Sequence, residues 1–204
     1  MGYAFMQASR RLGLTENASY ATFATAGQSW LQGAVLQLAS GLLVEASGTG
    51  AINTGVVGVA SSPFTAAITA SGGTAIGQET VPKVGAGTAI SAVRRAVVPA
   101  TAAQTFIGSI DTSGSQGAGS GLAVTDIGTA FRIRAVNAAG TAVASGGTWI
   151  VDRTAGGTGV AVIVVALVDP PGALVTDVPN LGAGDTGQSL VEFVFAPATV
   201  RFWG

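Results

Sequence analysis

The chain has 204 residues, enough for one domain with a sizeable core that needs no disulfide or metal to hold it together. It contains no cysteine and no histidine, which excludes disulfides, zinc–thiolate sites, thiol nucleophiles and the commonest general base. Nine basic and ten acidic residues leave a net charge of −1, so we expect no nucleic-acid partner. Low charge combined with 31 glycines and 48% hydrophobic residues is typical of a protein whose surface is covered by neighbours in an assembly.

Residues 1–28 are aromatic but follow neither a helical nor a strand period. This segment either covers the protein's own core or forms an arm that becomes ordered on a partner. We predict an N-terminal arm over 1–28 and a β-rich domain over 29–204. The candidate partner-binding residues are the aromatic and basic side chains of the arm, namely Tyr3, Phe5, Arg10, Arg11, Tyr20 and Phe23.

Short strand-like runs follow, separated by glycine, proline and small polar residues. Residues 30–46 hold two apolar runs divided by Ser40-Gly41, which predicts a hairpin with a short turn. Further strands are expected within 55–64, 79–85, 89–100 and 104–110. Over residues 130–136 the alternation predicts a half-buried strand, with Phe131 and Ile133 on the opposite face from Arg132 and Arg134.

Near the C-terminus we expect strands at 148–152, 159–169 and 189–196. The sequence "RTAGGT" between the first two has the composition of a tight hairpin loop, so we predict that these two strands pair. In the last strand, Val191, Phe193 and Phe195 share one face and Glu192 lies on the other. The predicted fold class is all-β, a barrel or sandwich of short antiparallel strands with an extended N-terminal arm.

Nine apolar residues stand in a row from Val160 to Val168. A membrane-spanning helix needs about 20 such residues, and the β-branched side chains of this run favour a strand. We therefore expect no membrane partner. Because the run does not alternate, we predict that both of its faces are covered, one by the domain core and the other by a second layer from this chain or from a neighbouring subunit.

Catalytic chemistry has no recognisable pattern in this chain. Serine nucleophiles need a base, and the single lysine, Lys83, lies beside Pro82 without a Ser-x-x-Lys motif. The acidic residues are spread along the chain and mostly flank turns, and the glycine-rich stretches lack a phosphate-loop fingerprint. We predict a protein that is not an enzyme, with no catalytic residue, no metal and no cofactor. Trp30 and Trp149 lie within strand patterns, so we expect both in the core.

Three strings carry a resemblance to a known family. The first, "GQSWLQGAVLQLASGLLVEASGTGAINTGVVGVASS", covers residues 27–62. The second, "TDIGTAFRIRAV", is a D-x-G turn that leads into a strand. The third, "GGTWIVDRT", contains a W-x-V-D strand. With these strings and its Gly/Ala/Val-rich, cysteine-free composition, the chain resembles the capsid decoration (cement) proteins of tailed bacteriophages over roughly 28–204.

The resemblance implies a virion structural protein made in the host cytoplasm and located on the outer capsid surface. Its implied partners are the major capsid protein and other copies of itself, as a homotrimer. It would stabilise the shell across junctions between capsid subunits. Two alternatives remain open: a tail, baseplate or head-fibre component, and a secreted adhesin or carbohydrate-binding module.

Overall fold

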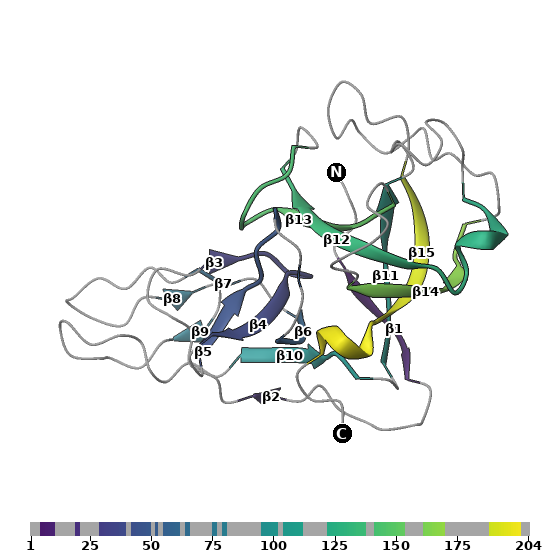
Figure 1. Cartoon of the computed structure of the whole chain (residues 1–204). Helices are drawn as coiled ribbons and strands as arrows, with labels where there is room; N and C mark the ends of the chain where they lie inside the picture. Colours follow the sequence, from purple (N-terminus) through teal and green to yellow (C-terminus); the bar gives the residue numbers. More distant parts are fainter. Residues whose placement is uncertain are drawn as a thin grey trace.

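The computed structural model describes residues 5–10, 19–20, 29–39, 42–49, 52, 55–61, 64–65, 75–76, 79–80, 95–101, 104–111, 122–137, 141–153, 161–169 and 188–200. Within these ranges the chain is built from strands, with two one-turn 3₁₀ helices, η1 (Val124–Asp126) and η2 (Pro197–Thr199) (Figure 1). The predicted all-β class is confirmed.

Five strands close into a barrel. In order around the barrel they are β11 (Gln104–Asp111), β13 (Thr148–Asp152), β12 (Ala130–Val136), β14 (Val162–Leu167) and β15 (Gln188–Phe195), and β15 pairs back with β11. The pair β11–β13 is parallel and the other pairs are antiparallel. Closure leaves these strands without the free edges of an open sheet.

Strict alternation places the apolar side chains of the barrel strands inside. Phe131 and Ile133 of β12 are buried, as predicted, and so are Phe193 and Phe195 of β15. The ring of Phe106 from β11 stacks on Phe193 at 5.9 Å and meets Phe195 edge-on at 5.3 Å. The interior of this small barrel is therefore filled by aromatic side chains.

The N-terminal strand β1 (Met6–Arg10) pairs with the barrel strand β11. β15 occupies one edge of β11, and the other edge is shared between β1, opposite residues 104–107, and β13, opposite Ile110 and Asp111. This part of the segment 1–28 therefore belongs to the barrel sheet, which favours the alternative in which the segment covers the protein's own core.

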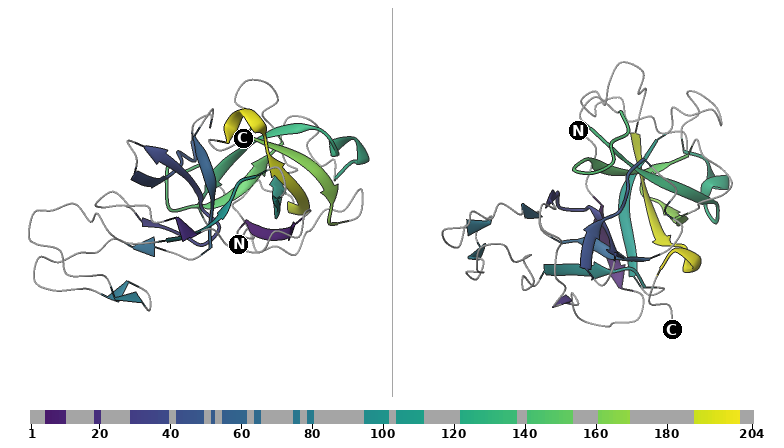
Figure 2. Two further views of the ribbon diagram at one scale, coloured as in Figure 1. Left: turned by 90° about the horizontal axis from the view of Figure 1, so that it is seen from below. Right: turned by 60° about the vertical axis from the view of Figure 1, so that its left-hand side comes forward.

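A second sheet has the strand order β2 (Ser19–Tyr20), β10 (Arg95–Pro99), β6 (Val56–Ala60), β4 (Val35–Ala39) and β5 (Leu42–Glu45). The pairing of Ala39 with Leu42 confirms the predicted hairpin with a short connection between β4 and β5. Two small pairs, β3 (Ser29–Trp30) with β7 (Phe64–Thr65) and β8 (Ala75–Ile76) with β9 (Glu79–Thr80), complete the strands. The second sheet and the barrel lie beside one another in both views of Figure 2.

One continuous core joins the two sheets. Trp30 and Trp149 are both buried in it, as predicted. β6, at the centre of the second sheet, is buried at every position. In the described part of the chain, no helix is long and apolar enough to cross a membrane.

The apolar run 160–168 is covered less completely than predicted. Val162 and Val164 of β14 are buried, but Ile163 and Val165 are only half-buried and Val168 is exposed. Within this chain, a second layer therefore covers the outer face of β14 only in part. An unbroken apolar run shows that both faces of the strand are apolar. Whether both faces are buried depends on a neighbouring layer, and the sequence of the run does not determine that layer. Coverage by another subunit stays a prediction.

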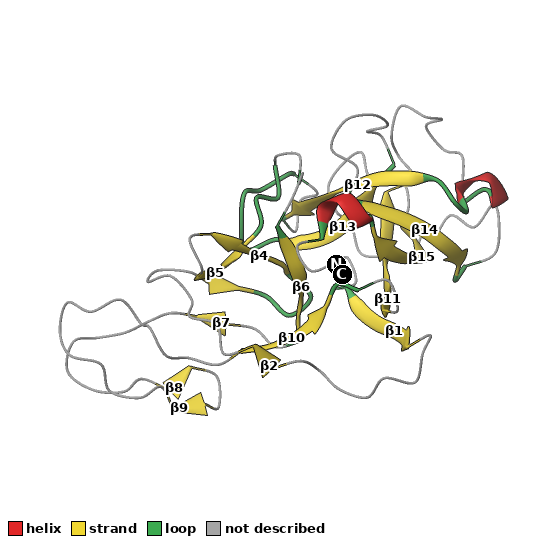
Figure 3. Cartoon of the chain, turned by 60° about the horizontal axis from the view of Figure 1, so that its bottom comes forward, coloured by secondary structure: helices red, strands yellow, loops and turns green. Residues whose placement is uncertain are grey.

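The predicted hairpin between residues 148–152 and 159–169 is wrong. β12 lies between β13 and β14 and pairs with both, so the two strands are not neighbours (Figure 3). The composition of "RTAGGT" is suited to a tight hairpin loop, but composition does not determine which strands pair. Strand partners are decided by packing around the closed barrel.

A glycine permits close contact between the two sheets. Gly48 follows β5, and its amide donates to the Ala144 carbonyl at 2.9 Å while its own carbonyl accepts from the Ala135 amide of β12 at 3.1 Å. A Cβ at this position would overlap Ala135 Cβ and the carbonyl oxygen of Val143. The second sheet therefore joins the barrel through backbone hydrogen bonds that only a residue without a side chain allows.

We expect Gly48→Ala to lower the free energy of unfolding by about 1–3 kcal/mol, because the added methyl group must push two backbone segments apart. Urea denaturation followed by circular dichroism measures the loss. Ser47→Ala, at the exposed neighbouring position, is the control and should change stability by no more than about 0.5 kcal/mol. An equal effect of the two substitutions would contradict the role of Gly48.

Candidate interaction surface

The second and third strings of the resemblance form one structural unit. The D-x-G string begins inside η1, at Thr125, and contains all of β12. The W-x-V-D string contains β13, which pairs with β12 in antiparallel register from Arg132–Asp152 to Val136–Thr148. A buried ion pair, Asp126 Oδ1 to Arg153 Nη2 at 3.1 Å, joins the start of the D-x-G string to the end of the W-x-V-D string. The two strings are therefore held together by strand pairing and, at the Arg132–Asp152 end of the β12–β13 pair, by this ion pair.

The local sequence explains the conformation of the turn at η1. The Asp126 carboxylate accepts a hydrogen bond from the Ala123 amide at 2.9 Å, which closes the turn in the way an aspartate commonly does. Gly128 then adopts φ +82°, a left-handed conformation that favours glycine. Its amide donates to the Val164 carbonyl at 2.8 Å, and this bond attaches the turn to β14.

This turn carries exposed apolar side chains. Val124 is 64% exposed and Ile127 is 45% exposed, and the attachment to β14 brings them to the end of the barrel where Val168, also 45% exposed, follows β14. Figures 1 and 3 show η1 beside that end of β14, on the side of the barrel away from the second sheet. We call Val124, Ile127 and Val168 the turn patch.

Among the described residues next to the turn patch, the charged side chains have partners within the protein. Asp126 and Arg153 are buried and neutralise each other beneath it. Asp169, which follows Val168, accepts a hydrogen bond from the Leu190 amide at 2.6 Å. A partner that covers these apolar side chains would therefore not have to strip water from an unpaired Asp126 or Arg153, and burial of the apolar area would favour binding.

The predicted partner-binding residues of the arm do not meet at one described surface. Phe5 is 2% exposed and packs edge-on against Phe193, with ring centroids 4.8 Å apart, so the structure places it in the protein's own core. Arg10 ends β1 and Tyr20 ends β2, and only their backbones are described. Tyr3, Arg11 and Phe23 lie outside the described residues.

Sequence reasoning missed the turn patch. Val124 precedes the D-x-G motif and Ile127 is its middle residue, and apolar residues at a turn motif were the available signal. Turns lie on the surface, so valine and isoleucine there are more informative than the same residues in a strand.

The described residues hold no group of three or more acidic, histidine or cysteine side chains that could bind a metal ion. Comparison with known protein families, with curated proteins and with solved structures found no match.

Proposed function

We propose that this chain is a capsid decoration protein of a tailed bacteriophage. It binds the outer surface of the capsid as a homotrimer, contacts the major capsid protein across subunit junctions and stabilises the shell. Its place of action is the virion, after synthesis in the host cytoplasm.

The observation that carries this proposal is the unit formed by η1, β12 and β13. Two strings that resemble the decoration family lie side by side and are joined by the Asp126–Arg153 ion pair, and the D-x-G string carries Ile127 of the turn patch. A small closed barrel with an exposed apolar contact is suited to a structural role, because it offers a rigid surface that loses little conformational entropy on binding.

A small contact between each decoration protein and the capsid stabilises the shell because it is repeated many times over the capsid surface. Burial of apolar surface contributes roughly 25 cal/mol per Å², and association costs consume part of it. A trimer that engages several capsid subunits at once converts later contacts into intramolecular ones, which raises the effective affinity by orders of magnitude. Separation of capsid subunits then requires the decoration contacts to break as well.

The proposal is tested with undecorated shells assembled from the major capsid protein encoded in the same genome as this chain. We expect the purified protein to co-sediment with the shells and to raise their disassembly temperature. The double variant Val124→Ser/Ile127→Ser should bind at least tenfold more weakly, because it removes most of the apolar area of the turn patch. Its circular dichroism spectrum should match that of the wild type, since both side chains are exposed.

Leu31→Ser provides the matched control. Leu31 is 47% exposed, like Ile127, but it lies in the turn that leads into β4 of the second sheet. Equal binding of wild type and Leu31→Ser, with weak binding of the turn-patch variant, supports the proposal. Failure of the wild type to bind shells, with binding to tails or baseplates instead, would replace it with the tail alternative.

A further inference from the structure

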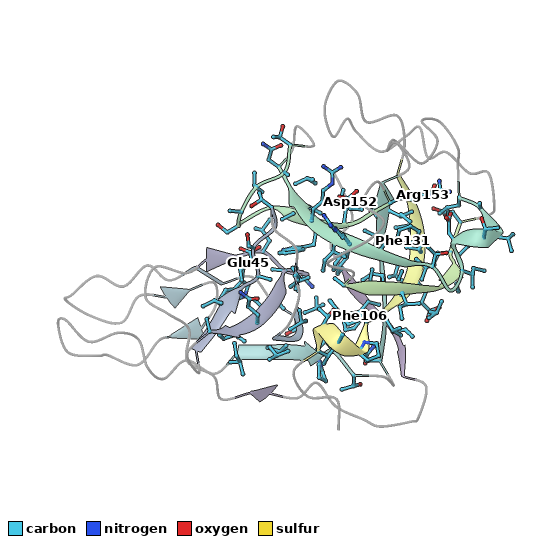
Figure 4. The ribbon with its side chains drawn as sticks, in the orientation of Figure 1. Glu45, Phe106, Phe131, Asp152 and Arg153 are labelled. Atoms are coloured by element: carbon cyan, nitrogen blue, oxygen red, sulfur yellow. The ribbon has the colours of Figure 1, made fainter. Side chains whose placement is uncertain are left out.

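Glu45 places a carboxylate at the junction between the second sheet and the barrel (Figure 4). It is the last residue of β5, and its side chain lies on the same face as Leu43, toward the core. Leu36, its cross-strand neighbour on β4, is fully buried, and Glu45 itself is only 7% exposed. An acidic side chain at a core-facing position is costly unless its oxygens are hydrogen-bonded.

Both oxygens of Glu45 accept hydrogen bonds from the barrel side of the junction. Oε1 accepts from the indole Nε1 of Trp149 at 3.0 Å, and Oε2 accepts from the amide of Gly146 at 2.8 Å. Trp149 is part of β13, and Gly146 reaches the carboxylate through a backbone at φ +70°. The carboxylate therefore connects the edge strand of one sheet to a strand of the other.

Within the described residues, the elements packed around Glu45 bring no opposite charge to it. β4 carries no charged residue, and neither does the described segment 141–149. The charged residues of β12 and β13, Arg132, Arg134 and Asp152, alternate with Phe131, Ile133 and Ala135 and lie on the outer face, where Arg134 pairs with Asp152 at 3.7 Å. Burial raises the pKa of Glu45 above its ordinary value of 4.5, and the bonds from Gly146 and Trp149 only partly counter it.

We propose that Glu45 is a proton-sensitive tie between the two sheets. Protonation of this buried carboxyl stabilises the folded chain relative to the unfolded chain, and ionisation of the carboxyl destabilises it. The tie is a property of the fold and does not depend on the proposed function.

The direction of the effect follows from linkage. Between pH 4.5 and the raised pKa, the folded protein binds a proton at Glu45 that the unfolded chain has lost. The contribution of this group to stability is therefore present at low pH and is lost as the pH rises through the folded pKa. Most carboxylates that are paired in the folded state act in the opposite sense.

Urea denaturation of the full chain between pH 4 and pH 8 tests the proposal, with wild type and Glu45→Gln compared at each pH. The unfolding equilibrium constant of the wild type, relative to that of Glu45→Gln, should rise with pH by a factor of ten for each unit by which the pKa is raised. Taking the ratio of the two proteins removes the titration of the other acidic residues.

The variant Trp149→Phe tests the same interaction while leaving the Glu45 carboxylate unchanged. Removing the indole donor withdraws a bond that stabilises ionised Glu45, so stability should fall more steeply with pH than in the wild type. Trp30→Phe is the matched control, because Trp30 is equally buried but is not among the donors to Glu45, and its pH dependence should follow that of the wild type.

Infrared or carbon NMR titration of the Glu45 carboxyl in the folded wild type adds a measurement that requires no variant to fold. Titration above 4.5 supports the proposal. Titration at or below 4.5, or a wild-type to Glu45→Gln ratio that is constant with pH, would overturn it.

Discussion

Replacing Phe5 with alanine will destabilise the protein by about 3–5 kcal/mol, the range for a fully buried phenylalanine. Phe5 is 2% exposed and its ring meets Phe193 edge-on. The ring also fills the space above Gly108 of β11, where a Cβ would overlap it. Its removal leaves a cavity in the barrel core and takes away the side chain that anchors the start of β1.

Urea denaturation measures this loss, with Leu31→Ala as the control for an exposed apolar side chain. Gly108→Ala should also be destabilising, because its methyl group displaces the Phe5 ring. In the double variant, the methyl group enters the space that the ring has left, so the combined cost should be less than the sum of the two. If Phe5→Ala were as stable as the wild type, Phe5 would not be a core residue and would again be a candidate for partner binding by the arm.

The position of Phe5 also changes how the arm must be tested. Deleting residues 1–25 removes β1 together with its anchor, so a loss of shell binding would follow from damage to the barrel as readily as from loss of a contact. Single substitutions at Tyr3, Arg11 or Phe23 leave Phe5 in place. They therefore separate partner binding by the arm from its contribution to the fold.

The second large effect is expected at the buried ion pair under the turn patch. Arg153→Met keeps the length of the side chain but leaves the Asp126 carboxylate buried without its cation. Loss of one partner from a buried pair costs about 3–5 kcal/mol, and we expect a value near the lower end because Asp126 keeps its bond from the Ala123 amide. Thermal and urea denaturation measure the change.

Two comparisons make the ion-pair prediction specific. Asp126→Asn/Arg153→Met should recover most of the loss, because no uncompensated charge remains and the asparagine oxygen still accepts from the Ala123 amide. Arg134→Met should cost less than Arg153→Met, because the Arg134–Asp152 pair is longer, at 3.7 Å, and more exposed. If the double variant were as unstable as Arg153→Met alone, the buried charge would not be the cause.

The sequence alone determined several of the strands and, for β12 and β15, which face is buried. Alternation in residues 130–136 and 189–196 correctly predicted that Phe131, Ile133, Phe193 and Phe195 point into the core. The turn at Ser40-Gly41 correctly predicted the β4–β5 pair. These features are local, since side-chain alternation and turn chemistry act over a few residues and are written directly in the sequence.

Only the tertiary structure decided which strands meet. β12 separates β13 from β14, β1 joins the barrel sheet, and Glu45 reaches Trp149 across 104 positions of the chain. The turn patch depends in the same way on the bond between Gly128 and Val164. Strand partners are selected by closure of the barrel and by filling of one shared core, and both depend on contacts between distant residues that no local pattern records.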